Sequence, residues 1–528
     1  MRVVFIAAEC EPWAKAGGLG DVVDALARAV ARVESVDSGA YHVLQSQVWI
    51  GTGGVLGASL PSSGHVESPV DIFVPRYRGV EVPADARTTP LAVPDPLAPD
   101  GTTEVSLIEF EARGHKIRMI DHPAAFDRDG FYGDADGDYP DNGWRFGLLC
   151  RAALEALLDD DRPVDVLHLH DWHATPAVIL RDLAYAAYPR ISSAGTMLTI
   201  HNFAHQGWLS REQLAGMCFP DELAQLIGPG EGGHSLLRAG LERAELVNTV
   251  SPGHAFEVLT PARGMGLDRA LRSLGHRFGG ILDGLDTDAW NPTTDTGIAA
   301  TYARDDLAGK AACRRALLTE FHMDPDSPAP VLGMVGRLGP YKGFEMVGEA
   351  AAELTAMGAR LVALGQGDPS FWGDLRDFAL QHPKEAVVVE RFDRALARRI
   401  YAGADLFVAP ARLEPCGQGQ MIALRYGTPP IAHNTGGLAD TVVDIDDRPD
   451  EGTGFLFEDE TKEDFLVAAR RAIASFKERG EKWDGLVDRG MAIDWSWEAG
   501  PAEQYAASYR RAVSIRREGP MERRGGSR

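Results

Sequence analysis

The chain has 528 residues, enough for about two or three domains, so one small single-core fold is excluded. Hydrophobic residues make up 45% and charged residues 25%, which is typical of globular proteins and excludes wholesale disorder. The 53 basic and 77 acidic residues give a net charge of −24, which repels nucleic acid and anionic lipid, so we expect no nucleic-acid partner and no membrane partner. Any anionic ligand must therefore meet a local basic site.

Cysteine usage and hydropathy indicate a cytoplasmic protein. The opening apolar run, residues 3–8, is too short for a signal peptide and is closed by Glu9, and no apolar stretch of about 18 residues follows. An odd number of cysteines without CxxC pairs argues against a disulfide framework. The five are Cys10, Cys150, Cys218, Cys313 and Cys416.

Short apolar runs, each followed by a turn and a helical pattern, recur in both halves and predict buried parallel strands. These runs are Val3–Ala8, Val166–His170, Thr196–Ile200, Val331–Val335, Leu361–Leu364, Ala386–Val389 and Leu406–Val408. The alternation predicts an α/β fold whose ligand loops follow the carboxyl ends of the strands. Two sheets facing across a cleft would explain the polar and glycine-rich motifs found just there.

The chain divides into a first domain over 1–295, a linker over 296–325 with a helix from Ala308 to Phe321, and a second domain over 326–490. An amphipathic helix is expected over 491–515, and a disordered basic tail over 516–528. Residues 32–69 are rich in Ser and Gly and too long for an ordinary connection. A surface excursion or an error in the gene sequence explains them better than a functional flap.

A glycine-rich loop, Lys15 to Asp21, follows the first strand. Glycines at 17, 18 and 20 let backbone N–H groups approach an anion at a helix start, and Lys15 supplies a cation, so the loop indicates phosphate binding. It is neither a GxxxxGK[ST] loop nor a GxGxxG fingerprint, which disfavours NTP hydrolysis and dinucleotide binding. A plain tight turn is the alternative.

A second basic pair, Arg337 and Lys342, follows the first strand of the second half. A guanidinium and an ammonium five residues apart in a loop can converge on one diphosphate and stabilise the charge on a leaving group. A solvated turn with two incidental cations is the alternative.

Glu414, Cys416 and Gly417 lie between the strand Leu406–Val408 and a helix expected from about Gln420. The carboxylate can contact a sugar hydroxyl or a cationic transition state, while the following N–H groups meet phosphate. Asn434–Asp440 repeats the same strand, glycine loop and helix design. The alternative for Glu414 is a helix cap.

No metal site is expected. His168, His170 and His173 cluster without the Cys or Glu partners of a zinc site, and Asp134–Asp138 is better explained as an acidic loop than as a DxD metal motif. GxSxG and HExxH motifs do not occur, so the sequence does not support a serine hydrolase or a zincin.

These segments together resemble the bacterial glycogen synthase and plant starch synthase family of retaining glucosyltransferases. The resemblance covers almost the whole chain apart from residues 32–69 and the last dozen residues. In the first half it rests on Lys15–Val22, Asp121–Pro123, Phe126–Arg128, Tyr139–Asn142, His170–His173, His201–Asn202, Val247–Pro252 and Trp290–Pro292. In the second half it rests on Gly336–Gly343, Glu414–Gly417 and Thr435–Asp440.

The resemblance implies two Rossmann-like domains facing across a cleft, the GT-B-type glycosyltransferase architecture, with the last helix crossing back to the first domain. It also implies transfer of glucose from ADP-glucose, a substrate, to the non-reducing 4-OH of an α-1,4-glucan such as glycogen or a maltooligosaccharide. The anomeric configuration is retained, and neither a cofactor nor a metal ion is needed.

Site residues follow from the same resemblance. The expected catalytic residues are Arg337, Lys342, Glu414, His201 and Asp171. The expected donor-binding residues are Lys15, Gly17, Gly18, Asp21, Asp283, Phe392, Cys416 and Gly417, with Phe392 stacking on adenine. The expected acceptor-binding residues are Tyr132, Trp172 and Asn202.

Two features bear on mechanism. Asp283 stands where the family usually has Asn, which replaces a donor–acceptor amide by a charged acceptor. A second carboxylate that could pair with Glu414 as a nucleophile is not evident, so we expect a front-face reaction in which the departing diphosphate takes the proton of the incoming hydroxyl.

Three other functions stay open at this stage. They are a related transferase that uses another activated sugar or a small acceptor, a catalytically silent glucan-binding protein, and a phosphorylase. A phosphorylase is disfavoured because no lysine is marked as the Schiff-base partner of pyridoxal phosphate. Residue chemistry alone does not choose between ADP-glucose and UDP-glucose, or give the oligomeric state.

Overall fold

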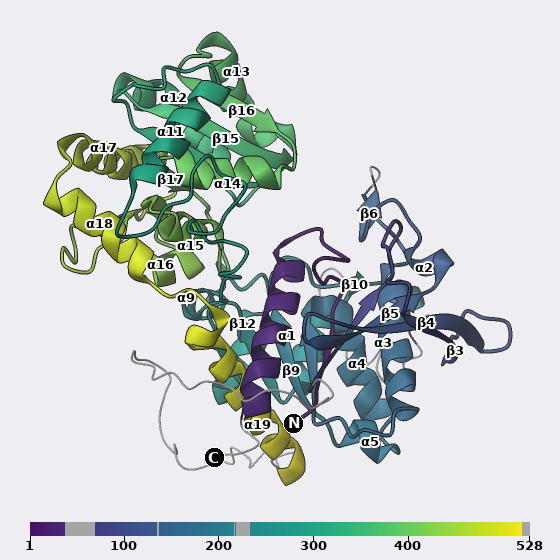
Figure 1. Cartoon of the computed structure of the whole chain (residues 1–528). Helices are drawn as coiled ribbons and strands as arrows, with labels where there is room; N and C mark the ends of the chain where they lie inside the picture. Colours follow the sequence, from purple (N-terminus) through teal and green to yellow (C-terminus); the bar gives the residue numbers. More distant parts are fainter. Residues whose placement is uncertain (37–68, 135–136, 216, 218–232, 520–528) are drawn as a thin grey trace. The chain divides into compact units, whose positions relative to one another are not determined.

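The computed structural model describes residues 1–36, 69–134, 137–215, 217 and 233–519, which form two separately packed α/β units (Figure 1). The first unit comprises residues 1–250, 255–284 and 497–528, and the second comprises residues 251–254 and 285–496. Most of the 32–69 excursion, the centre of the 134–138 acidic loop and most of the expected tail lie outside the described residues.

The first unit is built on a nine-stranded sheet in the order β13-β12-β9-β8-β1-β2-β5-β4-β3. The strands are β1 (Val3–Ile6), β2 (Val70–Pro75), β3 (Arg87–Pro94), β4 (Thr102–Ala112), β5 (His115–Asp121), β8 (Val166–His170), β9 (Gly195–Ile200), β12 (Leu246–Thr249) and β13 (Phe278–Gly280). Strands β3 and β4 pair antiparallel at one edge, whereas the strands from β13 to β5 pair parallel. The predicted strands at Val3, Val166 and Thr196 are confirmed as β1, β8 and β9.

Helices and short strands complete the first unit. The helices are α1 (Gly18–Val36), α2 (Pro123–Phe126), α3 (Asn142–Leu158), α4 (Asp171–Leu183), α5 (Pro189–Ser192), α6 (Arg211–Ala215), α8 (Leu236–Arg243), α10 (Asp268–Leu274) and α19 (Pro501–Glu518), with 3-10 turns η1 (Gly275–Arg277) and η3 (Trp497–Ala499). Helix α9 (Pro252–Glu257) is shared between the units. The short strands are β6 (Gly133–Asp134), β7 (Gly137–Asp138), β10 (Trp208–Leu209) and β11 (His234–Ser235).

Helix α19 returns the chain to the first unit, where it packs beside β9 and α1 (Figure 1). Gly195 permits this approach, because a Cβ there would lie 2.7 Å from the backbone carbon of Ala512. A buried hydrogen bond of 2.9 Å joins Tyr509 Oη to His168 Nδ1. The helix begins at Pro501 rather than near residue 491, since proline favours the first turn of a helix.

The second unit is built on a fully parallel sheet in the order β16-β15-β14-β17-β18-β19. The strands are β14 (Val331–Leu338), β15 (Arg360–Gly367), β16 (Ala386–Glu390), β17 (Leu406–Ala409), β18 (Pro430–His433) and β19 (Phe455–Phe457). Its helices are α11 (Ala308–Glu320), α12 (Phe344–Ala356), α13 (Gly373–Gln381), α14 (Arg394–Gly403), α15 (Gly419–Arg425), α16 (Gly436–Thr441), α17 (Lys462–Glu478) and α18 (Glu481–Ala492), with the 3-10 turn η2 (Pro369–Trp372). The four strands predicted in this half are confirmed as β14 to β17.

Residues 285–325 pack into the second unit, whereas the sequence suggested a first domain to residue 295 followed by a linker. Buried Tyr302 donates a hydrogen bond of 2.9 Å to the carbonyl of Tyr426, and Asp295 accepts hydrogen bonds of 2.7 Å from Arg398 and 2.5 Å from Tyr426. Because these side chains are satisfied only inside the second unit, the boundary falls at Gly284.

Both sheets place ligand loops where neighbouring crossovers diverge. Strand β1 lies between β2 and β8, and strand β14 lies between β15 and β17. Ligands of doubly wound sheets bind at the carboxyl ends of the strands at such switch points. The motifs of the sequence fall there: the glycine loop follows β1 and Asp171 follows β8, while Arg337 lies near the end of β14 and Glu414 follows β17.

Within the described ranges, no helix combines the length and hydrophobicity needed to cross a bilayer.

Candidate active site

In the second unit, an ion pair joins the loops that follow β14 and β17. Lys342 Nζ donates a hydrogen bond of 2.5 Å to Glu414 Oε2. The two loops are also tied by their backbones, because the N–H of Arg412 donates to the carbonyl of Tyr341 at 2.8 Å. Gly343 turns the chain with φ 68°, and a Cβ there would lie 2.0 Å from the carbonyl oxygen of Pro410. Close backbone packing therefore fixes the positions of Lys342 and Glu414.

Arg337 is exposed near the end of β14, and its guanidinium makes no hydrogen bond or ion pair with the residues that the structure describes. A guanidinium in this state keeps all its donors for an incoming anion. Phe392 follows β16 and is 70% exposed, so its ring face is open to a planar ligand. Both side chains are therefore accessible, as their predicted contacts require: Arg337 with the diphosphate and Phe392 with adenine.

Hydrogen bonds from two helices, α15 and α16, hold the loop from Glu414 to Gly417. The N–H of Gly437, at the start of α16, donates to the carbonyl of Glu414 at 2.9 Å. Gln420 of α15 donates from Nε2 to the carbonyls of Cys416 at 3.0 Å and Gly417 at 2.8 Å. Gly417 adopts φ 73°, which suits glycine. The assignment of Cys416 and Gly417 as donor-binding residues stays a prediction.

In the first unit, Glu9 occupies the glycine loop. Its Oε2 accepts hydrogen bonds from the N–H groups of Ala16 at 2.7 Å and Gly17 at 2.8 Å, and its Oε1 accepts one of 2.5 Å from the Tyr132 hydroxyl. Sequence reasoning did not single out Glu9, although an acid that closes a buried strand just before a glycine loop is a usable signal. A phosphate that binds the N–H of Gly17 therefore has to displace the Glu9 carboxylate. The N–H of Gly18 instead belongs to the first residue of α1.

Lys15 is paired with two acids of the same loop. Its ammonium bonds to Glu11 Oε2 at 3.2 Å and to Asp21. Burial raises the pKa of Asp21 to about 7, and its hydrogen bond with Glu11 adds to the shift. The structure therefore brings together Lys15 and Asp21, two of the predicted donor-binding residues, and Asp21 directs the ammonium rather than standing as a lone charge.

Asp171 holds the backbone around His201. It follows β8 as the first residue of α4 and adopts φ 57°, which is uncommon for a residue other than glycine. Its Oδ1 accepts the N–H of His201 at 2.7 Å, and the N–H of Asn202 also stabilises the carboxylate. The carbonyl of His201 and the N–H of Asn202 belong to the same peptide and point in opposite directions across its plane, so the carbonyl of His201 is turned away from Asp171. The family resemblance implies that either this carbonyl or the ring of His201 lies near the anomeric carbon.

A neighbouring histidine fixes the ring of His201. His170 Nδ1 and His201 Nε2 lie 3.1 Å apart and form a hydrogen bond. Burial lowers the pKa of His201 to about 3, so its ring is neutral. The sequence placed His170 in a strand without assigning it a role. Its register beside β9 could have revealed the contact, because β8 and β9 pair in parallel.

The remaining predicted residues of the first unit are largely enclosed. Trp172 is 8% exposed and packs against Gly207, where a Cβ would lie 2.3 Å from the indole. Asn202 accepts the N–H of Ala204 at 2.9 Å through its side chain. Asp283 is buried, and its N–H donates to the carbonyl of Val250 at 3.2 Å. Trp172 therefore supports the site wall instead of offering an open stacking face.

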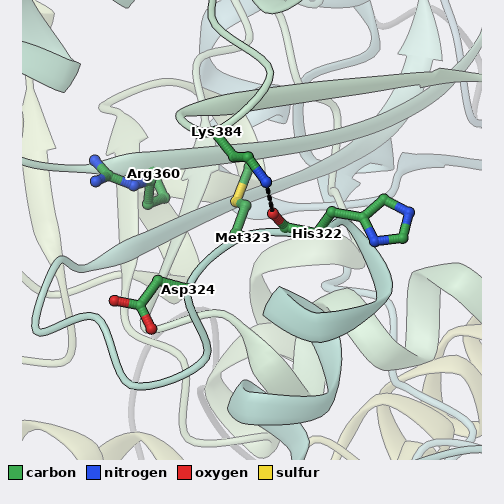
Figure 2. Close-up of a pocket in the computed structure, with 5 residues that line it drawn as sticks. All are labelled: His322, Met323, Asp324, Arg360 and Lys384. Atoms are coloured by element: carbon green, nitrogen blue, oxygen red, sulfur yellow. Dashed lines mark hydrogen bonds between the residues drawn. The ribbon is translucent and has the colours of Figure 1, made fainter.

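A cavity of about 430 Å³ lies in the second unit, lined by His322, Met323, Asp324, Arg360 and Lys384 (Figure 2). Lys384 Nζ donates to the carbonyl of His322 at 2.7 Å across it. Arg360 begins β15 and Lys384 precedes β16, so the cavity lies at the amino ends of the parallel strands. It is therefore at the sheet edge opposite the motif loops and is not part of the candidate site.

Replacing Asp171 by asparagine is expected to stabilise the fold in a pH-dependent way. Burial raises the pKa of Asp171 from 3.8 to about 7. The folded protein therefore binds a proton that the unfolded chain has lost between about pH 4 and pH 7, and this group's contribution to stability falls as pH rises through that window. Asparagine still accepts the N–H of His201 and tolerates positive φ.

Urea denaturation at about pH 5 and about pH 8 measures this effect. Asp171→Asn should be more stable than the original chain at the higher pH, by up to about 4 kcal/mol, and the gain should shrink at the lower pH. Asp171→Ala, which removes the acceptor, is the matched control and should be destabilised at both. A gain for Asp171→Asn that does not depend on pH would contradict the buried charge.

Comparisons with known proteins agree with this geometry. A family model for the starch synthase catalytic domain matches residues 2–37 and 51–273, and one for glycosyl transferases group 1 matches residues 321–483. The chain is 38% identical to the glycogen synthase of Anaeromyxobacter dehalogenans (strain 2CP-C), covering 97% of this chain and 99% of that protein. It is 35% identical to the glycogen synthase of Syntrophotalea carbinolica, covering 98% and 99%.

Solved structures give the same grouping. The catalytic domain of starch synthase IV from Arabidopsis thaliana, bound to ADP and acarbose, is similar with a TM-score of 0.83 at 33% identity, covering 97% of this chain and 99% of that one. Sucrose-phosphate synthase from Thermosynechococcus elongatus, at 18% identity and a TM-score of 0.55, shares the fold.

Proposed function

Because the chain belongs to the starch and glycogen synthase family of glucosyltransferases and has its GT-B fold, we propose that it elongates an α-1,4-glucan with glucose from ADP-glucose. The glucosyl unit passes to the non-reducing 4-OH with its anomeric configuration retained, and the reaction uses neither a cofactor nor a metal ion. The family resemblance found in the sequence is thereby confirmed, while the donor nucleotide and the acceptor belong to the proposal.

The Lys342–Glu414 ion pair at the β14/β17 switch point is the observation that carries the proposal. The bond between the anomeric carbon and the diphosphate oxygen breaks, and charge accumulates on the diphosphate. Arg337 near the end of β14 and Lys342 in the loop that follows it are cations that neutralise that charge as it develops. Glu414 keeps the Lys342 ammonium in place before the substrate arrives.

A front-face transfer completes the step. The departing diphosphate oxygen accepts the proton of the incoming 4-OH, and the 4-oxygen of the acceptor forms the new bond to the anomeric carbon. The charges therefore balance without a protein nucleophile. In the first unit, Asp171 accepts the N–H of Asn202, so the His201 carbonyl of the same peptide points away from Asp171. The partial negative charge of that carbonyl oxygen can stabilise a cationic sugar. The neutral ring of His201 adds no positive charge that would oppose this.

Incubation of the purified chain with a maltooligosaccharide and either ADP-glucose or UDP-glucose tests the proposal. We expect release of ADP together with chains lengthened by α-1,4-linked glucose, and a higher kcat/KM with ADP-glucose. A covalent glucosyl-protein adduct isolated during turnover would contradict the front-face route.

The same experiment separates the alternatives. Turnover with another sugar nucleotide or a small acceptor indicates a related transferase. Glucan binding without turnover indicates a silent binding protein. Phosphate-dependent shortening of the glucan, with absorbance from bound pyridoxal phosphate, indicates a phosphorylase.

A further inference from the structure

Three metal-ligating side chains from three elements meet behind the glycine loop. Cys10 follows β1, Asp24 lies on α1, and His115 is the first residue of β5. One ligand atom from each lies within 4.8 Å of the other two. All three residues are buried, with 0% exposure for Cys10 and His115 and 2% for Asp24. None of them belongs to the site proposed for glucosyl transfer.

Among the residues that the structure describes, the buried ring of His115 lacks the hydrogen-bond partners that it needs, which indicates that it binds a ligand. Within the described residues, neither of its nitrogens has a hydrogen-bond partner, although the whole side chain is buried. Buried polar groups in native proteins are nearly always satisfied, so an imidazole in this state needs an explanation. Its Nε2 lies 3.6 Å from Asp24 Oδ1. Zinc–nitrogen and zinc–oxygen bonds in a tetrahedral site put two such atoms roughly 3.4 Å apart.

Neighbouring arginines orient the carboxylate of Asp24. Its Oδ2 accepts a hydrogen bond of 3.1 Å from Arg28 Nε and forms an ion pair of 2.9 Å with Arg113 Nη1, and its Oδ1 lies on the side of His115. Hydrogen bonds of this kind hold ligating carboxylates in metal sites. The two guanidiniums also weaken the attraction for a cation, so we expect lower affinity than that of a structural site with four cysteine or histidine ligands.

We propose that Cys10, Asp24 and His115 form a binding site for one divalent cation of the zinc type. A thiolate and an imidazole select zinc or cobalt over magnesium and calcium, which prefer oxygen ligands. On binding, the Cys10 thiol releases its proton to solvent, and the sulfur, one carboxylate oxygen and one imidazole nitrogen coordinate the ion.

The site would fasten the glycine loop to the sheet. The N–H and carbonyl of Cys10 each pair with Ala14 at 2.8 Å, which closes the turn directly before Lys15. An ion held by Cys10, Asp24 and His115 joins this turn to α1 and β5. Metal binding therefore stabilises the loop that carries Lys15 and Gly17 without taking part in the reaction. This inference is independent of the proposed function.

Titration of the chelator-treated full-length chain with Co²⁺ tests the site. We expect one Co²⁺ per chain, a thiolate-to-cobalt absorption band in the near ultraviolet, loss of that band when Zn²⁺ is added, and a higher melting temperature with Zn²⁺ than without it. Cys10→Ser should abolish the band. His115→Gln should keep the sulfur but weaken the affinity at least about 100-fold, as expected for loss of a ligand.

Cys150→Ser is the matched control, because Cys150 is equally buried and lies outside the cluster. It should bind Co²⁺ like the original chain. Circular dichroism identifies any variant that does not fold, and His115→Gln tests the site if Cys10→Ser fails to fold. The proposal is overturned if the folded original chain gives no saturable band, or if the band persists in Cys10→Ser or at unchanged affinity in His115→Gln.

Discussion

Alanine at Arg337 or Lys342 is expected to lower kcat for glucan elongation by about 10²–10³, the range observed when one preorganised group that stabilises transition-state charge is removed. The Lys342→Ala loss should be the larger, because Glu414 is then left without its cation and repels the diphosphate. Arg337→Lys should recover part of the activity, since it restores the charge but not the planar fork of donors. Initial rates of ADP release, measured with saturating ADP-glucose and maltooligosaccharide, give these values.

The ion pair between Lys342 and Glu414 leads to a second prediction for the same residues. Lys342→Ala combined with Glu414→Gln removes both the cation and the carboxylate that it neutralises. If repulsion by Glu414 adds to the Lys342→Ala defect, the double variant will lose less than the sum of the two single losses. Arg448→Ala is the control, because Arg448 is an exposed arginine paired with Glu451. Elongation at an undiminished rate in the Arg337→Ala/Lys342→Ala variant contradicts the assignment of both residues.

Seven strands of the two sheets were predictable because buried parallel strands are nearly continuous apolar runs; they are β1, β8, β9 and β14 to β17. The hairpin of β3 and β4 was not predicted. Its exposed polar residues, such as Arg87 and Thr102, do not give the pattern of a buried strand. The boundary at Gly284 was missed for another reason: the segment after it is polar in sequence, and the side-chain partners of Asp295, Arg398 and Tyr426, are more than a hundred residues away.

Residue types identified most of the candidate site, but not its pairings. Lys342 and Glu414 were each singled out, yet their ion pair spans 72 positions of sequence. Glu9 was not singled out, and its contact with Tyr132, which is 123 positions away, is not visible in local sequence. Long-range partners of this kind are set by the order of strands in the sheet, which local patterns do not contain. The sequence therefore selected the loops that we propose to form the site, whereas the structure shows which of their charges are already paired.

Gly437→Ala is expected to disable the second unit's site through packing alone. A Cβ at residue 437 would lie 2.1 Å from the carbonyl oxygen of Cys416 and 2.4 Å from its Cα, distances at which backbone must move. The N–H of Gly437 also supports the carbonyl of Glu414 at 2.9 Å. A shift of this loop displaces the Glu414 carboxylate and, with it, Lys342.

We expect Gly437→Ala to lose about 3 kcal/mol of unfolding free energy, the upper part of the range for overpacked sites. Activity measured at a temperature where the variant is still folded should fall at least about 100-fold, since small displacements of catalytic groups are costly. Gly373→Ala is the matched control: Gly373 begins α13, and a Cβ there meets no atom within 4 Å. It should change stability by no more than about 1 kcal/mol, and favourably. The added atom at residue 437 would contact backbone and no group that binds a ligand. If Gly437→Ala has the rate and melting temperature of the original chain, the Glu414–Gly417 loop does not need its contact with α16 to hold its catalytic geometry.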